Sequence, residues 1–524
     1  MRSKAEVAAY LAEHNIKSRL EAALQQVVHD QPADPISAIA ALLSVPHDGT
    51  ALAAADASTT LAITVNHGER GEAALLNAAR MLGGSKLASQ CGLAAALEKL
   101  SVCSPPPADV TSWLAFRLRE LRPVVVVADY PEPVLKGLLM KCDEFANIHL
   151  LKTERPHPEV WNFRKTETAG LAVFGSGQCH LDGLAFLGAQ LKSLGYTRVL
   201  WFNMREEPVV FLNGQACAPR SANNMNENVE HLTSIQGHEL DSMEKRLCED
   251  CVEAAAAGDK TLGVYYQLAD GSNDERQLPV PPDRSLPVRG AYEWLNGRDA
   301  SAQLVYHRVP IADETAPEEQ DFDQLVSELR EIAYTGLADD VALVFNCQMG
   351  RGRTTTGMVC GSILLLASRG WQPPPDTPRL PEPAASGRNL KRGEYTAVLE
   401  LLRLVDSATQ TDASAAAGVV KEDRGWRAKA LVDMCCDDCG HAQNMVEAIV
   451  ACTESAKTAE LGVARSPEFW SRRAHNYLER YAYILLFAAY ALEEVHSGFE
   501  ATFTEWSHRH WQFKRVIKHL TLLA

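Results

Sequence analysis

A cysteine and an arginine six positions later are the residues best suited to chemistry in this sequence. Cys347 and Arg353 enclose two glycines, with an apolar run before them at 341–345 and a second apolar stretch after them at 357–367. The first run predicts a strand and the second predicts a helix, so the cysteine lies at a strand-to-helix turn. Unpaired amide groups and the helix dipole bind anions at such a turn. The sequence therefore predicts a phosphate ligand beside a thiolate.

The residue types in this loop suit attack on a phosphate group. A helix N-terminus and a nearby arginine can lower the pKa of a thiol from about 8.5 to between ~3.5 and 7.5, so Cys347 is a candidate nucleophile. Arg353 offers a planar fork for two phosphate oxygens, and the glycines let amide groups turn inward. The loop residues expected to contact phosphate are Gln348, Met349, Gly350, Arg351, Gly352 and Thr354.

Two other interpretations of the loop stay open. A free cysteine is often a small buried hydrophobe, and a loop of this kind can bind phosphate without turning it over. None of the other twelve cysteines has an arginine six positions later, and the glycines, the strand and the helix all favour an anion site. The ATP-binding loop is excluded, because its Gly-x4-Gly-Lys-Ser/Thr pattern is missing.

The loop resembles the signature of cysteine-dependent phosphatases, in the branch of the tyrosine-phosphatase-like inositol phosphatases (phytases) and the paladin family. The resemblance extends over roughly residues 165–524 and is much more specific than the loop alone. Four further segments carry it: G-S-G-Q-C-H-L-D-G-L at 175–184, F-N-M-R-E-E-P with F-L-N-G at 202–214, Y-H-R-V-P-I-A-D-E-T-A-P at 306–317, and N-Y-L-E-R-Y-A-Y-I-L-L at 476–486 followed by Trp506.

The resemblance implies a role for each residue of the site. Cys347 attacks phosphorus and forms a phosphocysteine, and Asp313 protonates the leaving oxygen and then activates water. Arg353 holds the equatorial oxygens. Further phosphates are expected to meet Arg351 and Arg308.

Arg205 is expected to orient the acid or to reach the substrate. For Arg205 and Arg308 the alternative is a surface ion pair. For Asp313 the alternative is a solvated loop acid, because Glu314 and two other carboxylates lie close to it in the sequence.

Departures from the family pattern weaken the case for activity. Asn346 precedes the cysteine where tyrosine phosphatases carry histidine, and Glu314 follows the acid where phytases carry histidine. Paladin-type proteins carry two phosphatase-like repeats, whereas this chain has one Cys-x5-Arg. The alternative function is therefore a weak or inactive phosphatase-like scaffold.

Composition limits the classes of function. The 524 residues are 46% hydrophobic and 23% charged, which is ordinary for a globular protein of two to four domains. A net charge of −16 disfavours nucleic acid as a partner. No apolar run is long enough for a transmembrane helix. Thirteen scattered cysteines favour a reducing, cytoplasmic location, and the residues call for no cofactor and no metal.

Residues 1–46 predict a second recognisable unit, a helical hairpin with a break at 31–35. It resembles the dimerisation and docking domain of the protein kinase A regulatory subunit. That resemblance implies a homodimer that binds an amphipathic helix of a partner protein, and a place in the axoneme of a cilium or flagellum. The alternative is an ordinary hairpin packed on the next domain. The residues expected at this interface are Ile16, Leu20, Leu24, Val27, Ile36, Ile39 and Leu43.

The expected fold is α/β, with a cysteine-phosphatase-like, mostly parallel sheet flanked by helices, an N-terminal helical hairpin and a C-terminal helical region. Strands of this sheet are expected near 199–204, 263–268, 304–309 and 341–345. The predicted organisation is the hairpin at 1–46, an α/β scaffold lobe or degenerate phosphatase-like repeat at 50–165, the phosphatase-like domain at 166–372, a proline-rich linker at 373–392 and a helical part at 393–524.

Overall fold

The computed structural model describes residues 138–144, 155–381 and 388–522, with short gaps at 169, 223–224, 227, 229–234, 298–301, 336, 409–422, 440–444, 460–465 and 521. All of them belong to one unit of the chain, Tyr130–Ala524. The predicted N-terminal hairpin and most of the predicted lobe at 50–165 lie outside the described residues.

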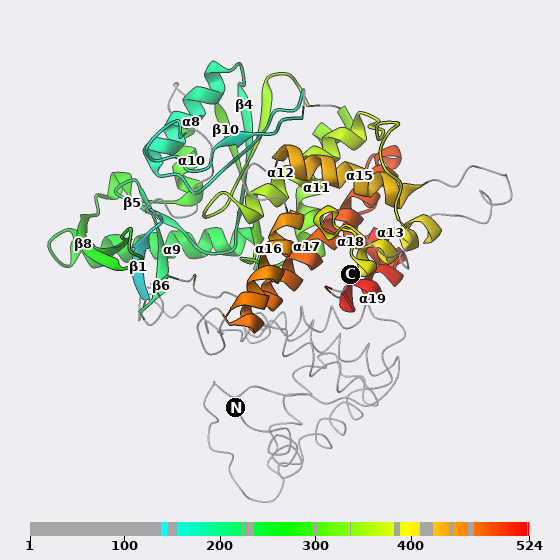
Figure 1. Cartoon of the computed structure of the whole chain (residues 1–524). Helices are drawn as coiled ribbons and strands as arrows, with labels where there is room; N and C mark the ends of the chain where they lie inside the picture. Colours follow the sequence, from blue (N-terminus) through cyan, green and yellow to red (C-terminus); the bar gives the residue numbers. More distant parts are fainter. Residues whose placement is uncertain are drawn as a thin grey trace, which may run out of the picture. The chain divides into compact units, whose positions relative to one another are not determined.

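Strands and helices alternate in the first half of this unit, and helices fill the second half (Figure 1). The strands are β1 (Leu138–Cys142), β2 (Arg164–Lys165), β3 (Val173–Ser176), β4 (Arg198–Arg205), β5 (Val210–Leu212), β6 (Gln215–Ser221), β7 (Thr261–Gln267), β8 (Asn273–Pro279), β9 (Leu286–Pro287), β10 (Gln303–Ile311) and β11 (Val341–Asn346). The α-helices are α8 (Leu181–Ser193), α9 (Gly237–Ala256), α10 (Val288–Asn296), α11 (Glu319–Thr335), α12 (Gly352–Ser368), α13 (Thr396–Ala408), α15 (Arg424–Cys439), α16 (Met445–Thr458), α17 (Pro467–Glu494), α18 (Phe503–Arg509) and α19 (Gln512–Lys518).

The sheet that carries the cysteine loop has the order β10-β4-β11-β3-β2. The first four strands are parallel, and β2 is antiparallel to β3. Alternate residues of β4 enter different cores: Leu200 and Phe202 pack with α11 and α12, whereas Val199 and Trp201 pack with α8 and α10. Burial on both faces explains the nearly continuous apolar runs of these strands. The predicted mostly parallel sheet flanked by helices is thus confirmed.

A second sheet has the order β8-β7-β1-β6-β5-β9. The prediction placed 263–268 in the first sheet, but this segment forms β7 of the second sheet. Strand β1 lies between β7 and β6, parallel to the former and antiparallel to the latter. Residues 138–142 and 164–165 therefore complete the two sheets. Nothing in the local sequence of these short strands indicates their distant partners.

The C-terminal helices cover the face of the first sheet that bears α12. The longest of the described helices, α17, begins at Pro467 after Ser466, whose hydroxyl accepts the Phe469 amide. The apolar residues at 477–492 of α17 belong to the same core as α12. A close approach also joins α12 to β11, since a Cβ at Gly357 would lie 2.5 Å from the ring of Phe345.

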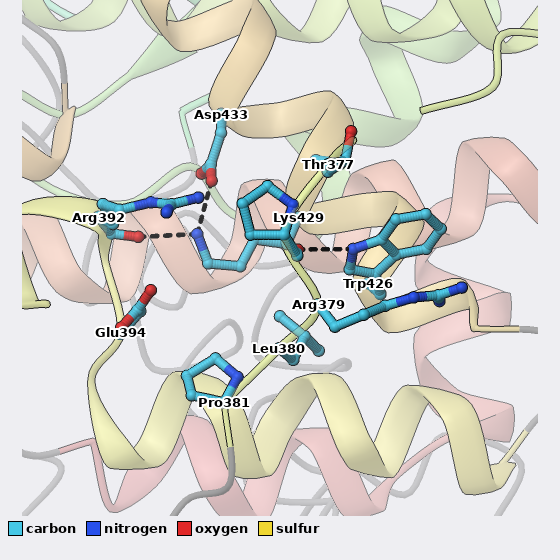
Figure 2. A pocket seen from close by; sticks show the side chains of 11 residues that line it. Thr377, Arg379, Leu380, Pro381, Arg392, Glu394, Trp426, Lys429 and Asp433 are labelled. Atoms are coloured by element: carbon cyan, nitrogen blue, oxygen red, sulfur yellow. Dashed lines mark hydrogen bonds and ion pairs between the residues drawn. The ribbon is translucent and has the colours of Figure 1, made fainter. Parts of the chain in front are cut away.

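The described part of the proline-rich segment packs on α15, where it lines a shallow pocket (Figure 2). The Trp426 indole donates to the carbonyl oxygen of Pro378 at 2.9 Å. Lys429 Nζ donates to the carbonyl oxygen of Arg392 at 2.7 Å and to Asp433 at 2.6 Å. These bonds fix the proline-rich segment to α15 at two points, Pro378 and Arg392.

Within the described ranges, no helix combines the length and the apolar character that a membrane span requires.

Candidate active site

The predicted turn places Cys347 immediately after β11 and just before α12. The sulfur is buried, and Thr354 Oγ1 donates to Cys347 Sγ at 3.1 Å. The same hydroxyl lies 3.2 Å from the carbonyl oxygen of Ser176, so its one proton is shared between the two acceptors. Gly350 has a φ of +75°, and a Cβ there would lie 2.4 Å from the backbone nitrogen of Gly177. Only glycine fits this bend.

Three successive carbonyl oxygens of the loop are bound from outside it. The bonds run from the Gln178 amide to Gln348 (2.9 Å), from Asn162 Nδ2 to Met349 (2.7 Å) and from Arg164 Nη1 to Gly350 (2.7 Å). In a trans peptide the N–H points away from the C=O. The amides at 349–351 therefore face the interior of the loop, as an anion site requires.

Carboxylates hold the guanidinium of Arg353 at the mouth of the loop. Arg353 Nη1 donates to Glu207 at 2.7 Å and to the carbonyl oxygen of Ile311 at 3.1 Å, and Nη2 lies 3.3 Å from Asp313. Burial alone would raise the pKa of Glu207, but Arg353 and Arg205 outweigh it and lower this pKa to about 2. Glu207 is thus ionised, and it fixes the arginine that the sequence predicted to bind phosphate.

The structure brings Asp313 to the same place. Its side chain is 42% exposed, and besides Arg353 it faces Asn228, whose Nδ2 lies 3.4 Å from Asp313 Oδ2. The neighbouring acid, Glu314, turns away to pair with Arg473 at 2.5 Å. Of these two adjacent carboxylates, only Asp313 faces the cysteine loop through Arg353.

A buried polar network borders the loop on the side of the second sheet. Asp143 accepts from Arg205 at 2.5 Å, from Gln348 Nε2 at 3.2 Å and from Arg220 at 3.5 Å. Arg205 also donates to Glu207 at 3.2 Å. Arg205 therefore fixes Glu207, not Asp313 as one of the predicted roles supposed. Strand β1, through Asp143, reaches the side chain next to the nucleophile.

Helix α17 holds the loop that carries the acid. Arg480 is fully buried, and its Nε donates to the carbonyl oxygen of Thr315 at 2.8 Å. A Cβ at Gly352 would lie 3.0 Å from Arg480 Nη1. Arg480 therefore touches both the nucleophile loop and the acid loop. Glu314 has a φ of +59°, a strained conformation for this residue, and its ion pair with Arg473 holds it there.

Arg308 is placed differently from the phosphate contact that the sequence predicted. It is 2% exposed. Its guanidinium donates to Glu244 and to the Tyr306 hydroxyl, each at 2.9 Å, and to the carbonyl oxygens of Arg205 and Glu207. These partners tie β10 to β4 and α9, which is a structural role. Arg351, in contrast, is half-buried at the rim of the loop.

Sequence reasoning missed several residues of this site. Glu207 and Arg480 lie inside two segments that carry the family resemblance, at 202–214 and 476–486, so the sequence did indicate that these segments matter. Asp143, Asn162 and Arg164 gave none, because they are distant in sequence from the loop they contact. The predicted loop residues and Asp313 are brought together by the fold.

Solved structures offer limited similarity to this chain. The PTP-like myo-inositol phosphatase from Mitsuokella multacida, in complex with myo-inositol-(1,3,4,5)-tetrakisphosphate, has a TM-score of 0.41 and 15% sequence identity, covering 76% of this chain and 55% of that one. A PTP-like phytase from Bdellovibrio bacteriovorus has a TM-score of 0.35 and 14% identity, covering 70% and 94% of the respective chains.

Sequence relatives are more informative. Paladin of Homo sapiens is 29% identical over 374 residues, which cover 68% of this chain and 40% of the relative. Paladin of Gallus gallus is 29% identical over 373 residues, with 68% and 39% covered. The chain thus spans about two-fifths of the length of the curated relatives it matches.

A family model also matches the segment that contains the nucleophile loop and the acid. It is the PTP-like phytase model, described by the words inositol hexakisphosphate, and it matches residues 202–365. Residues 202–365 therefore resemble the PTP-like phytase family, within a chain that is similar to the paladins over 68% of its length.

Proposed function

We propose that this chain is a cysteine-dependent phosphomonoesterase that acts through a phosphocysteine intermediate. One observation carries the proposal: Cys347, Arg353 and Asp313 meet at a loop whose amides at 349–351 face inward. Such a loop stabilises the three equatorial oxygens of a phosphoryl group in the transition state. The scaffold, a phosphatase-like domain, is already established by the family match.

Each side chain has a step in the proposed reaction. The Cys347 thiolate attacks phosphorus in line while Asp313 protonates the departing oxygen. Asp313 then removes a proton from water, which attacks the phosphocysteine and releases phosphate. Thr354 donates a hydrogen bond to Cys347 Sγ, so it stabilises the sulfur when it leaves as a thiolate. The carboxylate of Glu207 keeps Arg353 in position throughout.

The proposed substrate class is an inositol phosphate, a phosphoinositide or a phosphoprotein. The chain carries a net charge of −16, so a polyanion must be captured by local cations. Arg351 and Arg473 stand at intermediate exposure near the rim of the loop. A substrate with more than one phosphate would contact both the loop and this rim, which favours inositol phosphates within the class.

The test uses the purified full chain with a panel of inositol phosphates, phosphoinositide vesicles and phosphopeptides. Phosphate release and a rapid acid quench with labelled substrate are measured. The expected result is label bound to the peptide that contains Cys347, with inhibition by vanadate. Absence of both release and label from every substrate would contradict the proposal.

A second candidate function is a catalytically weak scaffold, and the position before the nucleophile favours it. Asn346 accepts the Trp201 indole N–H at 2.9 Å, so this position holds an amide tied to the core rather than a titratable imidazole. In this proposal the hairpin at 1–46 dimerises and docks an amphipathic helix. Sedimentation of the full chain and of Leu20→Asp tests it: a dimer lost in the variant, with no turnover in either, supports the scaffold.

A further inference from the structure

Two cysteines outside the catalytic loop lie opposite each other on neighbouring strands of the second sheet. Cys142, the last residue of β1, is the register partner of Cys217 on β6. Both are free and at most 1% exposed, and they lie in the same apolar cluster beneath α9. Neither takes part in the proposed reaction.

The register decides how close the two side chains come. In the next pair along, the Asp143 amide donates to the carbonyl oxygen of Ala216 at 2.9 Å, so Asp143 and Ala216 occupy a hydrogen-bonding position of the ladder. Pairs alternate along antiparallel strands, so Cys142 and Cys217 form a non-hydrogen-bonded pair. Such pairs have Cα atoms about 4.5 Å apart and the closer side chains. That separation lies within the range of about 4.4 to 6.8 Å that a disulfide spans.

An imidazole and an amide oxygen also face Cys142, whose sulfur donates to Gln215 Oε1 at 3.9 Å. His180 Nε2 lies 3.7 Å from Cys142 Sγ, and His180 Nδ1 accepts the Ala216 amide at 3.0 Å. A backbone amide can only donate, so Nδ1 carries no proton and the neutral ring is protonated on Nε2. This N–H points at the sulfur and stabilises a thiolate.

The same tautomer argues against a metal at this cluster. Cys142, Glu144 and His180 offer ligand atoms within 4.8 Å of one another. A histidine that binds a metal through one nitrogen normally donates its other N–H to an acceptor. Here the other nitrogen of His180 accepts, which leaves Nε2 without a lone pair for a metal.

Electrostatics separates Cys142 from equally buried cysteines. A hydrogen bond from Cys217, together with His180 and against the cost of burial, lowers the pKa of Cys142 below that of an ordinary thiol. Cys179 is also 1% exposed, and burial raises its pKa to about 12. The cluster lies close to the protein surface, since a carboxylate oxygen of the exposed Glu144 lies within 4.8 Å of the Cys142 sulfur.

We propose that Cys142 and Cys217 are a peroxide-reactive thiol pair that closes into a disulfide. The Cys142 thiolate attacks one oxygen of hydrogen peroxide, an S–O bond forms, the O–O bond breaks, and the departing hydroxide takes a proton to become water. The Cys217 sulfur then gives up its proton and attacks the Cys142 sulfur. The S–O bond breaks and a second water leaves. Two thiols are oxidised by two electrons, and one peroxide is reduced to two waters.

The disulfide would act on a strand that reaches the catalytic loop. Asp143 follows Cys142 directly, and its carboxylate accepts from Gln348 and Arg205. A covalent link between β1 and β6 would restrict the motion of that carboxylate. The pairing itself is independent of the proposed function, because it requires no turnover by Cys347.

The test titrates the full chain with hydrogen peroxide, in the wild type and in a Cys347→Ser background that removes the catalytic thiol as a competitor. Remaining thiols are alkylated and the peptides are mapped by mass spectrometry. The expected product is a peptide pair linked through Cys142 and Cys217. Cys142 is expected to be oxidised at least ~10-fold faster than Cys179, its equally buried control, because the thiolate is the reactive form.

Two variants separate the steps. In Cys217→Ser the link is expected to disappear and a sulfenic-acid probe is expected to label Cys142. In His180→Gln the oxidation of Cys142 is expected to slow by ~10-fold. If Cys142 reacts no faster than Cys179 in the wild type, or if its link goes to any other cysteine, the proposal is overturned without reference to how the variants fold.

Discussion

Two buried thiols lie at the C-terminal ends of two strands of this molecule, and their surroundings differ. Cys347 follows β11, a central strand of the parallel sheet, and the chain continues directly into a helix. Cys142 ends β1, which is paired in the other sheet with an antiparallel neighbour. The first thiol therefore meets inward-facing amides, and the second meets a cross-strand cysteine.

The partners of each sulfur set its chemistry. Cys347 has a hydroxyl donor from Thr354 and, at the mouth of its loop, the guanidinium of Arg353 with its carboxylates. In the proposed reaction these groups stabilise an incoming phosphoryl group and the departing thiolate. Cys142 has an imidazole N–H and a second thiol. Those groups favour a thiolate and form no loop of amides for a phosphate, which fits the oxidation proposed for this pair.

The largest effect expected is the loss of turnover in Cys347→Ser. Removal of the nucleophile should lower kcat by at least ~10⁴-fold. Cys142→Ser is the matched control, because its sulfur ends a strand in the same way but contacts no loop amide. It should retain phosphate release at the wild-type rate. A comparable loss in both variants would remove the distinction between the two thiols.

Asp313→Asn should lower kcat by ~10² to 10⁴-fold, because the general acid is lost. The loss should be smaller for an aryl phosphate than for an inositol phosphate, since a good leaving group needs less protonation. Glu318→Gln, a change in a nearby acid whose carboxylate accepts from Gln320 Nε2 at 3.1 Å, is the control. An equal loss for both leaving groups would argue against the acid role of Asp313.

Arg480→Met should lower kcat by up to ~10²-fold, because the acid loop loses the donor to the Thr315 carbonyl and shifts relative to the nucleophile. KM should change less than kcat. Arg480→Lys should recover part of the rate. Arg472→Met, an exposed change on the same helix, is the control. A variant that melts earlier but turns over at the wild-type rate while folded would show that Arg480 only stabilises the fold.

The parts that sequence predicted are those encoded by contiguous residues. The strand at 341–345, the loop and the helix at 357–367 follow from hydrophobic pattern and glycine placement, and all three are present as β11, the turn and α12. Asp313 was found through a motif, and the structure places it beside Arg353. Local pattern carries enough information when an element and its neighbours are consecutive.

The parts that sequence missed depend on pairing over long distances. The contacts of Asp143 with Gln348 and of Arg164 with Gly350 join residues about two hundred positions apart. Arg308 was predicted at the surface or at a phosphate. Its charge alone does not reveal that it forms a buried ion pair with Glu244 on α9. The opposition of Cys142 to Cys217 is likewise set by strand register, which no spacing rule indicates.

The stability that each of the two regions contributes should change with pH over a different range. Glu207 has a pKa of about 2 in the fold against 4.5 when unperturbed. A lowered carboxylate pKa contributes stability that is full above 4.5 and is lost as pH falls towards the lowered pKa. The pKa of Cys142 is lowered from 9.0 by a hydrogen bond from Cys217 and by His180, so this thiol contributes stability that is lost at a higher pH, as pH falls below 9.

Chemical denaturation across this pH range measures both contributions. In a plot of unfolding free energy against pH, Glu207→Gln should reduce the loss of stability below pH 4.5 and leave the part above pH 6 unchanged. Cys142→Ser should change the part above pH 6 and leave the acidic part unchanged. Glu253→Gln, an exposed change on α9, should leave both parts as they are. If Glu207→Gln altered the part above pH 6 instead, the carboxylate next to Arg353 and the thiolate next to His180 would be one coupled system. The two thiol sites would then not be independent, because proton binding at one site would change proton binding at the other.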